Sequence, residues 1–405
     1  MTKLEELIEK LCPDGVEYKE IGSIAVLGAG GDVPKARFSA EKTVEFNIPI
    51  YSNGIEEKAI YGYTDIPKVD EPSITISARG TIGWCALRKE PFYPIVRLIY
   101  VTPNTEILVD FLKYVIDTIK FKVPKTGIPQ LTIPMVSKYK IPVPPLEVQR
   151  EIVRILDNFT FLTAELAAEL AARQKQYEYY RDLLLTFKPN ESTILNERTN
   201  ELELSGAIRW MKLGDIAKFT YGYTDKAKDF GNARFIRITD ITEDGCLNSQ
   251  GAKYINLTAD SKKYLLNYGD LLLARTGATY GKTLYFSSDI PAVYASFLIK
   301  ITLDNNIISN RFYWHFSKSR LYWEQAEKLV SQGGQQQFNT NAVSRVNIPV
   351  PPLEVQQRIV DILDRFDTLC NDISSGLPAE IEMRQKQYEY YRDKLLTFKE
   401  LKKEA

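Results

Sequence analysis

Two short strings contain residue types that could bind a nucleotide. RTGATYGKT at 275–283 follows the order GxxxGKT, one residue short of the phosphate-binding loop GxxxxGKS/T. The LYFSS that follows favours a strand, whereas that motif requires a helix N-terminus at this point. VLGAGGDVP at 26–34 has Val33 where a dinucleotide fingerprint needs its last glycine. We therefore interpret both strings as glycine-rich loops rather than cofactor sites.

Residues for metal binding and acid–base catalysis are scarce. His315 is the only histidine, and the cysteines at 12, 85, 246 and 370 form no CxxC pair. This pattern predicts neither a zinc site nor a disulfide framework. The NPPY string typical of adenine methyltransferases is absent as well. We expect no catalytic residue and no metal ligand in this chain, and a structural role for His315.

The dominant feature of the chain is an internal repeat. IPVPPLEVQ at 141–149 returns unchanged at 348–356, and RQKQYEYYRD at 173–182 returns at 384–393. A repeat of this length implies two structurally equivalent elements. The offset is 207 residues for the first string and 211 for the second, so the later copy holds four extra residues in its middle.

Each copy reads as a long amphipathic helix. Proline cannot lie inside a helix, so the first helix should begin after PVPP, near Leu146, and run to Phe187. The second should run from Leu353 to about residue 399, with a break at Gly376 and Pro378. The two apolar stripes are most economically buried against each other, although each helix could instead cap its own globular domain. The predicted stripe of the first helix includes Ile152, Ile155, Phe159, Leu162, Leu166, Leu170, Tyr177 and Leu184.

The segments between the repeats share one plan. Residues 1–145 begin with the helix LEELIEKL, continue with strand-like IPIYS, AIYGYT, SITISA and FYPIVRLIYVT, and end with a helix capped by Asn104 or Thr105. Residues 209–352 keep this order. LLLARTGATYG corresponds to TISARGTIG, AVYASFLIKIT corresponds to FYPIVRLIYVT, and a helix begins near Ser309. The polar stretch 188–208 reads as a linker. The predicted fold class is α+β, with two mixed α/β domains (1–145 and 209–352) alternating with helices at 146–187 and 353–400, in a pseudo-two-fold arrangement.

Composition is that of an ordinary globular protein with an uneven distribution of charge. The formal net charge is zero, but residues 209–352 hold 18 basic and 12 acidic side chains. A basic domain of this kind is compatible with contact to DNA. The sequence has no apolar run long enough for a membrane helix, and its N-terminus is unlike a signal peptide, so we expect a cytoplasmic protein without a membrane partner.

The motifs PPLxxQxxIVxILDxF and RQKQYEYYRDxLLTF, repeated around two different blocks, closely resemble the specificity subunit of type I restriction-modification systems. The resemblance covers essentially the whole chain. It implies that each block is a target recognition domain for one half of a bipartite double-stranded DNA site, and that the helices form an antiparallel coiled coil. It also implies two modification subunits bound to that coil, and further restriction subunits. S-adenosylmethionine, ATP and magnesium would then belong to those partners, and this chain would bind no cofactor.

Candidate DNA contacts are basic and amide side chains in glycine-rich loops. Arginine reads guanine, and asparagine or glutamine reads adenine, through paired hydrogen bonds in the major groove. The candidates of the first block are Lys35, Arg37, Arg79, Thr81, Lys125 and Gln130, and those of the second are Lys226, Lys228, Arg275, Thr276, Lys282, Gln335, Gln336 and Gln337.

The tyrosines of the repeat divide by helix face. Tyr177 and Tyr180 share a face with Leu184, so we expect them to pack against the partner helix. Tyr179 and Tyr390 point elsewhere and are candidates for the interface with a modification subunit, because tyrosine is enriched at protein interfaces.

Three other functions remain open from the sequence. The chain could be the recognition subunit of another heteromeric restriction-methylation enzyme. It could be a coiled-coil scaffold that binds no DNA, or a nucleotide-hydrolysing enzyme that uses RTGATYGKT. DNA binding at low and moderate salt tests the scaffold, and titration with a nucleotide tests the enzyme.

The length of the helices generates a first prediction. One additional four-residue unit in TAELAAEL at 163–170 should lengthen the first helix by about 6 Å. That is just under two base pairs at about 3.4 Å each. Mapping of the DNA site should then show a longer spacer between unchanged half-sites; an insertion that alters the bases read would contradict a spacer role.

Overall fold

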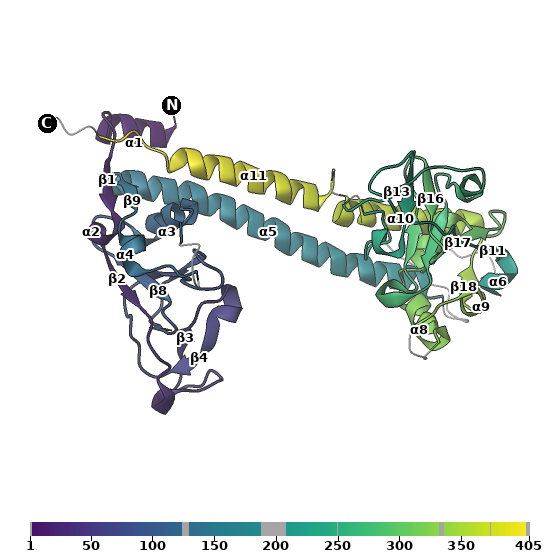
Figure 1. The fold of residues 1–405 in the computed structure, drawn as a ribbon, viewed down its shortest axis with the longest axis horizontal. Helices are drawn as coiled ribbons and strands as arrows, with labels where there is room; N and C mark the ends of the chain where they lie inside the picture. Colours follow the sequence, from purple (N-terminus) through teal and green to yellow (C-terminus); the bar gives the residue numbers. More distant parts are fainter. Residues whose placement is uncertain are drawn as a thin grey trace, which may run out of the picture. The chain divides into compact units, whose positions relative to one another are not determined.

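The computed structural model describes residues 2–123, 129–187, 208–248, 250–331, 336–372 and 374–401. The chain divides into two compact units (Figure 1). Unit 1 comprises Met1–Glu165 together with Glu382–Ala405, and unit 2 comprises Leu166–Ile381. Of the predicted linker, only Ile208 lies within the described residues.

Unit 1 is built on a four-stranded antiparallel sheet of order β2-β8-β5-β6. A three-stranded sheet, β4-β3-β7, accompanies it, and in it β3 and β7 run parallel. The short pair β1-β9 joins the start of the block to its end. Its elements are α1 Lys3–Leu11, β1 Glu17–Glu20, α2 Ile21–Ile24, β2 Ala25–Ala29, η1 Lys35–Arg37, β3 Ile48–Tyr51, η2 Glu56–Ala59, β4 Ile60–Thr64, β5 Ser73–Ile76, β6 Cys85–Arg88, β7 Tyr93–Pro94, β8 Ile99–Pro103, α3 Val109–Thr118, α4 Ile133–Ser137 and β9 Lys140–Val143.

Unit 2 repeats this sheet topology. Its four-stranded sheet has the order β11-β17-β14-β15, and its three-stranded sheet, β13-β12-β16, again holds one parallel pair, β12 and β16. The pair β10-β18 corresponds to β1-β9. The predicted common plan of the blocks is therefore confirmed. Its elements are β10 Arg209–Lys212, α6 Leu213–Ile216, β11 Ala217–Tyr221, β12 Ala233–Ile236, η3 Ile238–Asp240, β13 Tyr254–Ile255, η4 Ser261–Tyr264, β14 Leu271–Ala274, η5 Gly277–Thr279, β15 Thr283–Tyr285, β16 Ala292–Tyr294, β17 Leu298–Leu303, α7 Asn310–Phe316, α8 Arg320–Leu329, α9 Thr340–Val343 and β18 Asn347–Val350.

The repeated helices are α5 (Leu146–Leu185), α10 (Leu353–Asn371) and α11 (Leu377–Leu395). The predicted break in the second copy lies between α10 and α11. There the Asp372 carboxylate accepts hydrogen bonds from the hydroxyls of Ser374 and Ser375. Gly376 packs so tightly against the last carbonyls of α10 that a Cβ would lie 2.5 Å from the Thr368 oxygen.

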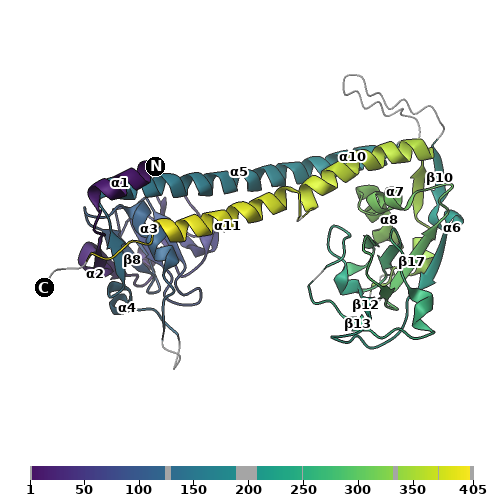
Figure 2. The ribbon, with the colours of Figure 1, turned by 90° about the horizontal axis from the view of Figure 1, so that it is seen from above.

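The helices pair with each other inside each unit, as predicted. In unit 1 the ring of Phe159 on α5 stacks on Tyr391 of α11, and the two helices run side by side in both views (Figure 1, Figure 2). In unit 2 the rings of Tyr177 and Tyr180 both stack on Phe366 of α10. The packing of these two tyrosines against the partner helix is thereby confirmed.

The core of unit 1 is completed by residues from the start of α5 and from the C-terminal part of the chain. Val148, Ile152 and Leu156 at the start of α5 pack with the sheet and α3, and so does Leu396 after α11. The C-terminal segment also pairs with the N-terminal one, because the Val16 amide donates to Lys399 O and the Leu401 amide donates to Val16 O. Apolar burial and backbone hydrogen bonds thus fasten the end of the second repeat to the first block.

The core of unit 2 is completed in the same way. The end of α5 contributes Leu184 and Leu185, and the start of α10 contributes Ile359 and Leu363. Each block therefore packs against the end of one repeated helix and the start of the other. The apolar stripes are buried both against the partner helix and against the globular blocks, so the two alternatives occur together. The predicted stripe needs one correction: Leu162 is 45% exposed, whereas Leu156, which was not part of it, is fully buried.

A glutamine of the PPLEVQ motif ties each helix start to its block. Gln356 is fully buried; its Oε1 accepts from the Ser309 amide, and its Nε2 donates to the carbonyls of Ile307 and Pro351. Gln149 repeats this geometry with the Leu108 amide and the carbonyls of Glu106 and Pro144. Both copies have glutamine here because one acceptor and two donors are needed in a buried place, and a side-chain amide supplies both kinds of group.

The strand-like string FYPIVRLIYVT holds two strands, β7 and β8, because a tight turn between Ile95 and Leu98 divides it. One local expectation is wrong. Helix α3 begins at Val109 rather than after Asn104 or Thr105, and its N-cap residue Leu108 has no side-chain cap. The Leu108 amide is satisfied by Gln149 instead. In unit 2, by contrast, a helix begins near Ser309 as predicted, and the Ser309 side chain caps α7.

Replacing Gln356 by alanine should destabilise unit 2. One buried amide and two buried carbonyls would lose their partner, which should lower the free energy of unfolding by about 3 kcal/mol. Urea unfolding of the full chain, followed by tryptophan fluorescence, measures this change; three of the four tryptophans, Trp210, Trp314 and Trp323, lie in unit 2. Gln357→Ala on the exposed side of the same turn is the matched control, and an equal loss for both variants would contradict the anchoring role.

Candidate nucleic-acid interface

Three segments of unit 2 converge on Arg275. This residue follows β14, and its amide donates to Phe297 O in the turn between β16 and β17. The Arg275 carbonyl in turn accepts from the amide of Phe338, just before α9. The loop after β14, the β16–β17 turn and the segment before α9 therefore form one surface, built by backbone hydrogen bonds that do not depend on most side chains.

The guanidinium of Arg275 is held in place at this surface. Its Nε donates to Ser296 O at 3.2 Å, and its Cζ lies 5.2 Å from the ring centre of Tyr221 and 5.4 Å from that of Phe297. Both rings are partly exposed. A guanidinium flanked by aromatic faces is stabilised by cation–π attraction and keeps its terminal N–H groups for a ligand.

The same three segments converge in unit 1. The loop after β5 places Arg79 beside Gln130, whose Oε1 accepts from Nε at 3.1 Å and from Nη2 at 2.7 Å. The Leu131 amide donates to Ala78 O, as the Phe338 amide does to Arg275 O. The structure thus brings together two predicted residues, Arg79 and Gln130. In backbone pairing Ala78 is the counterpart of Arg275, so Arg79 lies one position further along its loop, where unit 2 has Thr276.

Glycines shape both arginine loops. Gly80 and Gly83 in unit 1 have φ of 68° and 87°, and Gly277 and Gly281 in unit 2 have φ of 72° and 81°. Glycine adopts this left-handed region without steric cost. The glycines of RTGATYGKT therefore serve a turn that leads into strand β15, as the LYFSS pattern predicts.

The threonines of these loops face inward. Thr276 is buried and pairs through its backbone with Gln337. The hydroxyl oxygen of Thr81 is buried and has no hydrogen-bond partner among the residues that the structure describes. Gln336 and Gln337 are exposed beside Thr276, whereas the candidates Lys125 and Gln335 lie outside the described residues.

The other predicted cations lie on separate segments. Lys35 and Arg37 are exposed on η1, and Arg37 Nε donates to the Asp65 carboxylate at 3.0 Å. Lys226 and Lys228 are exposed in the loop after β11. No hydrogen bond or ion pair in the described part of the chain joins these four residues to the arginine loops, so they remain separate candidates for contact with the DNA backbone.

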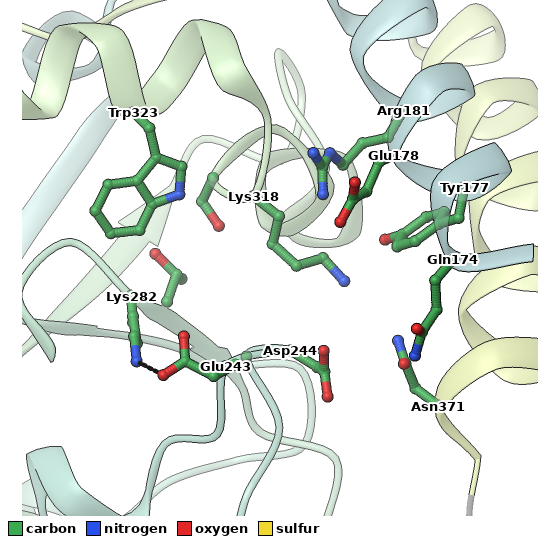
Figure 3. A pocket seen from close by; sticks show the side chains of 13 residues that line it. Gln174, Tyr177, Glu178, Arg181, Glu243, Asp244, Lys282, Lys318, Trp323 and Asn371 are labelled. Carbon is green, nitrogen blue, oxygen red and sulfur yellow. Dashed lines mark hydrogen bonds and ion pairs between the residues drawn. The ribbon is translucent and has the colours of Figure 1, made fainter. Parts of the chain in front are cut away.

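Lys282 lines a cavity of about 410 Å³ in unit 2 (Figure 3). Its ammonium pairs with Glu243, and its side chain is only 14% exposed. The opposite wall comes from α5 and includes Tyr177, Glu178 and Arg181. Lys282 is thus placed at the junction between the block and α5, rather than in the cluster around Arg275.

The same junction holds His315, which is buried beside α10. Its Nε2 lies 2.7 Å from the Asp364 carboxylate, and Nδ1 lies 3.4 Å from the Tyr177 hydroxyl. Burial lowers the pKa of His315 to about 4, so the ring is neutral at neutral pH. In unit 1 the Tyr114 hydroxyl donates to Asp157 at the matching place. His315 therefore has the structural role expected of it.

Tyr179 and Tyr390 are 64% and 62% exposed. Both occupy the same position of the repeated string RQKQYEYYRD, on α5 and α11 respectively. Their exposure contrasts with that of Tyr177, which is buried in the core of unit 2. They are accessible to a partner, as their predicted role requires.

Within the described ranges, no group of three or more histidine, cysteine, aspartate or glutamate side chains could hold a metal ion. None of the helices that the structure describes has the length and apolar character needed to cross a membrane.

Sequence reasoning missed Arg97, Asn53, Tyr221 and Phe297. Arg97 lies in the β7–β8 turn, where its Nη1 is 3.5 Å from Gln130 Oε1. Arg97 was not a candidate because the apolar, strand-like string FYPIVRLIYVT gives no sign of this turn. The alignment of that string with AVYASFLIKIT places Arg97 opposite Phe297, and the turn would have revealed both residues at a surface.

A sequence model of one protein family, described as the type I restriction modification DNA specificity domain, matches residues 13–173 and again 208–383. The chain belongs to this family. The two matches include both arginine loops. The recognition domains and repeated helices predicted from the sequence are those of a type I specificity subunit.

Relatives and solved structures agree with this assignment. The specificity subunit of the EcoR124I/EcoR124II enzyme of Escherichia coli is 36% identical over 65% of this chain, and the match spans 64% of that subunit's length. A putative specificity subunit of Haemophilus influenzae, S.HindORF215P, is 31% identical over 98% of both chains. The crystal structure of an S subunit from M. genitalium has the same fold, with a TM-score of 0.58 at 16% identity over 98% of this chain and 99% of that one. A structure from a study of complex assembly in the type I R-M system gives a TM-score of 0.57 at 16% identity, over 96% and 98%.

Alanine at Arg275 and alanine at Lys226 should have different effects on a DNA-binding specificity subunit. Loss of Arg275 should cost about 1–3 kcal/mol of discrimination at one base position, because a paired contact to a base edge is lost. Loss of Lys226 should weaken binding to all sequences and reduce the salt dependence by about one phosphate contact. Titration of matched and base-substituted duplexes at several salt concentrations measures both. If both variants weakened binding to all duplexes equally, Arg275 would not read a base.

Proposed function

We propose that this specificity subunit reads a bipartite double-stranded DNA site, one half with each recognition domain, and catalyses no reaction itself. Methylation and cleavage would then be carried out by modification and restriction subunits that bind to it. S-adenosylmethionine, ATP and magnesium would be bound by those subunits. The complex would work in the cytoplasm.

One observation carries this proposal: both units present an arginine on the loop that follows the equivalent strand, β5 or β14, at neighbouring positions and in different surroundings. Arg79 is held by a glutamine amide, whereas Arg275 is held by a backbone carbonyl and two aromatic rings. The two units have the same backbone arrangement but carry different side chains on it. Two recognition domains built in this way can read different bases. Arginine in such an arrangement can bind guanine through O6 and N7.

The helices supply the second part of the proposal. They are fastened to the blocks at both ends by buried apolar residues and by Gln149 and Gln356. Helices fastened in this way can set the spacing between two half-sites. The exposed Tyr179 and Tyr390, at equivalent places of the two repeats, are suited to bind two copies of a modification subunit, one at each.

The proposal is tested by expressing the chain together with its modification subunit and mapping methylated adenines across a genome by single-molecule sequencing. A motif of two short half-sites with a fixed unspecified spacer is the expected result. Arg275→Ala should relax one half and leave the other unchanged, because each unit reads independently. A stable complex without any motif would overturn DNA reading by these units, and failure to form a complex would overturn docking on the helices.

A further inference from the structure

A pair of arginines in unit 1 is bound to a single neutral acceptor. Gln130 Oε1 accepts from Nε and Nη2 of Arg79, at 3.1 and 2.7 Å, and lies 3.5 Å from Nη1 of Arg97. The two guanidiniums come from segments that are separated in sequence, the loop after β5 and the β7–β8 turn. Gln130 therefore gathers two positive charges at one place on the surface.

A second amide fixes the backbones that carry these arginines. The Ala78 amide donates to Asn53 Oδ1 at 2.7 Å, and Asn53 Nδ2 donates to Val96 O, also at 2.7 Å. Ala78 precedes Arg79, and Val96 precedes Arg97, so Asn53 joins the two segments next to each arginine. The distance between the two arginine Cα positions is thereby set by hydrogen bonds from one side-chain amide to the backbone of both segments.

The turn that presents Arg97 is strained. Val96 and Arg97 have φ of 52° and 60°, a region that side chains other than glycine and asparagine rarely adopt. Backbone hydrogen bonds from Val96 N to Gly31 O and from Arg97 N to Gly30 O hold the turn against this preference. A Cβ at Gly30 would lie 2.6 Å from Ile95 N, so glycine is required beneath the turn. Strain of this kind persists where the surrounding structure enforces it, and it is concentrated at functional sites.

The charges of the pair have no counter-ion within the described residues. Arg37 and Arg154 of the same unit, in contrast, pair with the carboxylates of Asp65 and Glu151. In the part of the chain that the structure describes, no residue accepts a hydrogen bond from Nη1 of Arg79 or from Nε and Nη2 of Arg97. Two like charges held together repel each other, and an acceptor-rich ligand relieves that repulsion.

From this geometry we infer that Arg79 and Arg97 act as a pair that reads guanine in the half-site of unit 1, and that Gln130 positions them rather than reading adenine. The inference rests on the proposed function and deepens it. The guanidinium fork matches O6 and N7 of guanine, and fixed forks side by side fit one or two neighbouring G·C pairs. A phosphate could also accept hydrogen bonds from such a fork, and the variants below separate the two ligands, because a phosphate contact carries no base preference. Unit 2 has Phe297 in place of Arg97, so the paired reader belongs to unit 1 alone.

Arg97→Gly is the decisive variant, because glycine suits the φ of this position and the turn should persist. In the complex with the modification subunit, discrimination at a G·C pair in one half-site should fall about ten- to a hundredfold, with the other half-site unchanged. Arg79→Ala should affect the same half-site, and Arg275→Ala the other. Lys138→Ala, which removes an exposed charge of unit 1 outside the two loops, is the matched control and should leave discrimination unchanged.

Gln130 variants separate positioning from folding. Gln130→Leu should relax the same G·C pair, because the acceptor is lost. Gln130→Glu keeps an acceptor there and should retain discrimination, while its negative charge weakens binding to every duplex. A merely structural role would instead reduce methylation without changing which base is preferred.

The outcomes distinguish the inference from the proposed function. If the unaltered chain yields no bipartite motif, the proposed function itself fails. If it yields a motif but Arg97→Gly weakens all duplexes equally, Arg97 contacts phosphate and the guanine reading is overturned. A change in the half-site that depends on Arg275, or no change at all, overturns it as well.

Discussion

The structure depends on the apolar ends of the repeated helices. These ends complete the hydrophobic cores of blocks that include residues far away in the sequence. Unit 1 closes only when residues after α11 return to the first block, and unit 2 closes only when the end of α5 meets the start of α10. Burial of these residues removes a large apolar surface from water, which is the main favourable contribution to folding. It also fixes which helix end belongs to which block. Long-range contacts of this kind require much of the chain to be in place before the first block is complete.

Polar groups define the register of this apolar packing. Gln149 and Gln356 each satisfy one amide and two carbonyls where a helix meets its block. A buried amide with all its hydrogen bonds satisfied tolerates no shift along the helix, since a displacement of one residue would leave three backbone groups unpaired. The repeated PPLEVQ string thus encodes a position as well as a helix start.

The sequence predicted what depends on local pattern or repetition, and not what depends on contacts across the chain. Helix starts after PVPP, the break at Gly376 and the common plan of the blocks follow from proline chemistry and from the repeat. The start of α3 was misplaced because its first amide is satisfied by Gln149, which lies far along the chain. The β7–β8 turn was missed because Val96 and Arg97 have no intrinsic preference for it and are held there by Gly30 and Gly31. Lys282 was grouped with Arg275 by proximity in sequence, although the hairpin between β14 and β15 directs it toward α5.

The backbone hydrogen bonds around the arginine loops have an evolutionary consequence. In both units a main-chain bond joins the arginine loop to the segment before α4 or α9, from Leu131 N to Ala78 O and from Phe338 N to Arg275 O. Main-chain hydrogen bonds persist through most substitutions. The exposed side chains of the arginine loops can therefore change by single mutations without a loss of fold. A lineage could thereby acquire a new preference at one half of its target while the other half, and the attachment to its partners, stay as they were. Variation would be concentrated at a few exposed positions on an otherwise constrained scaffold.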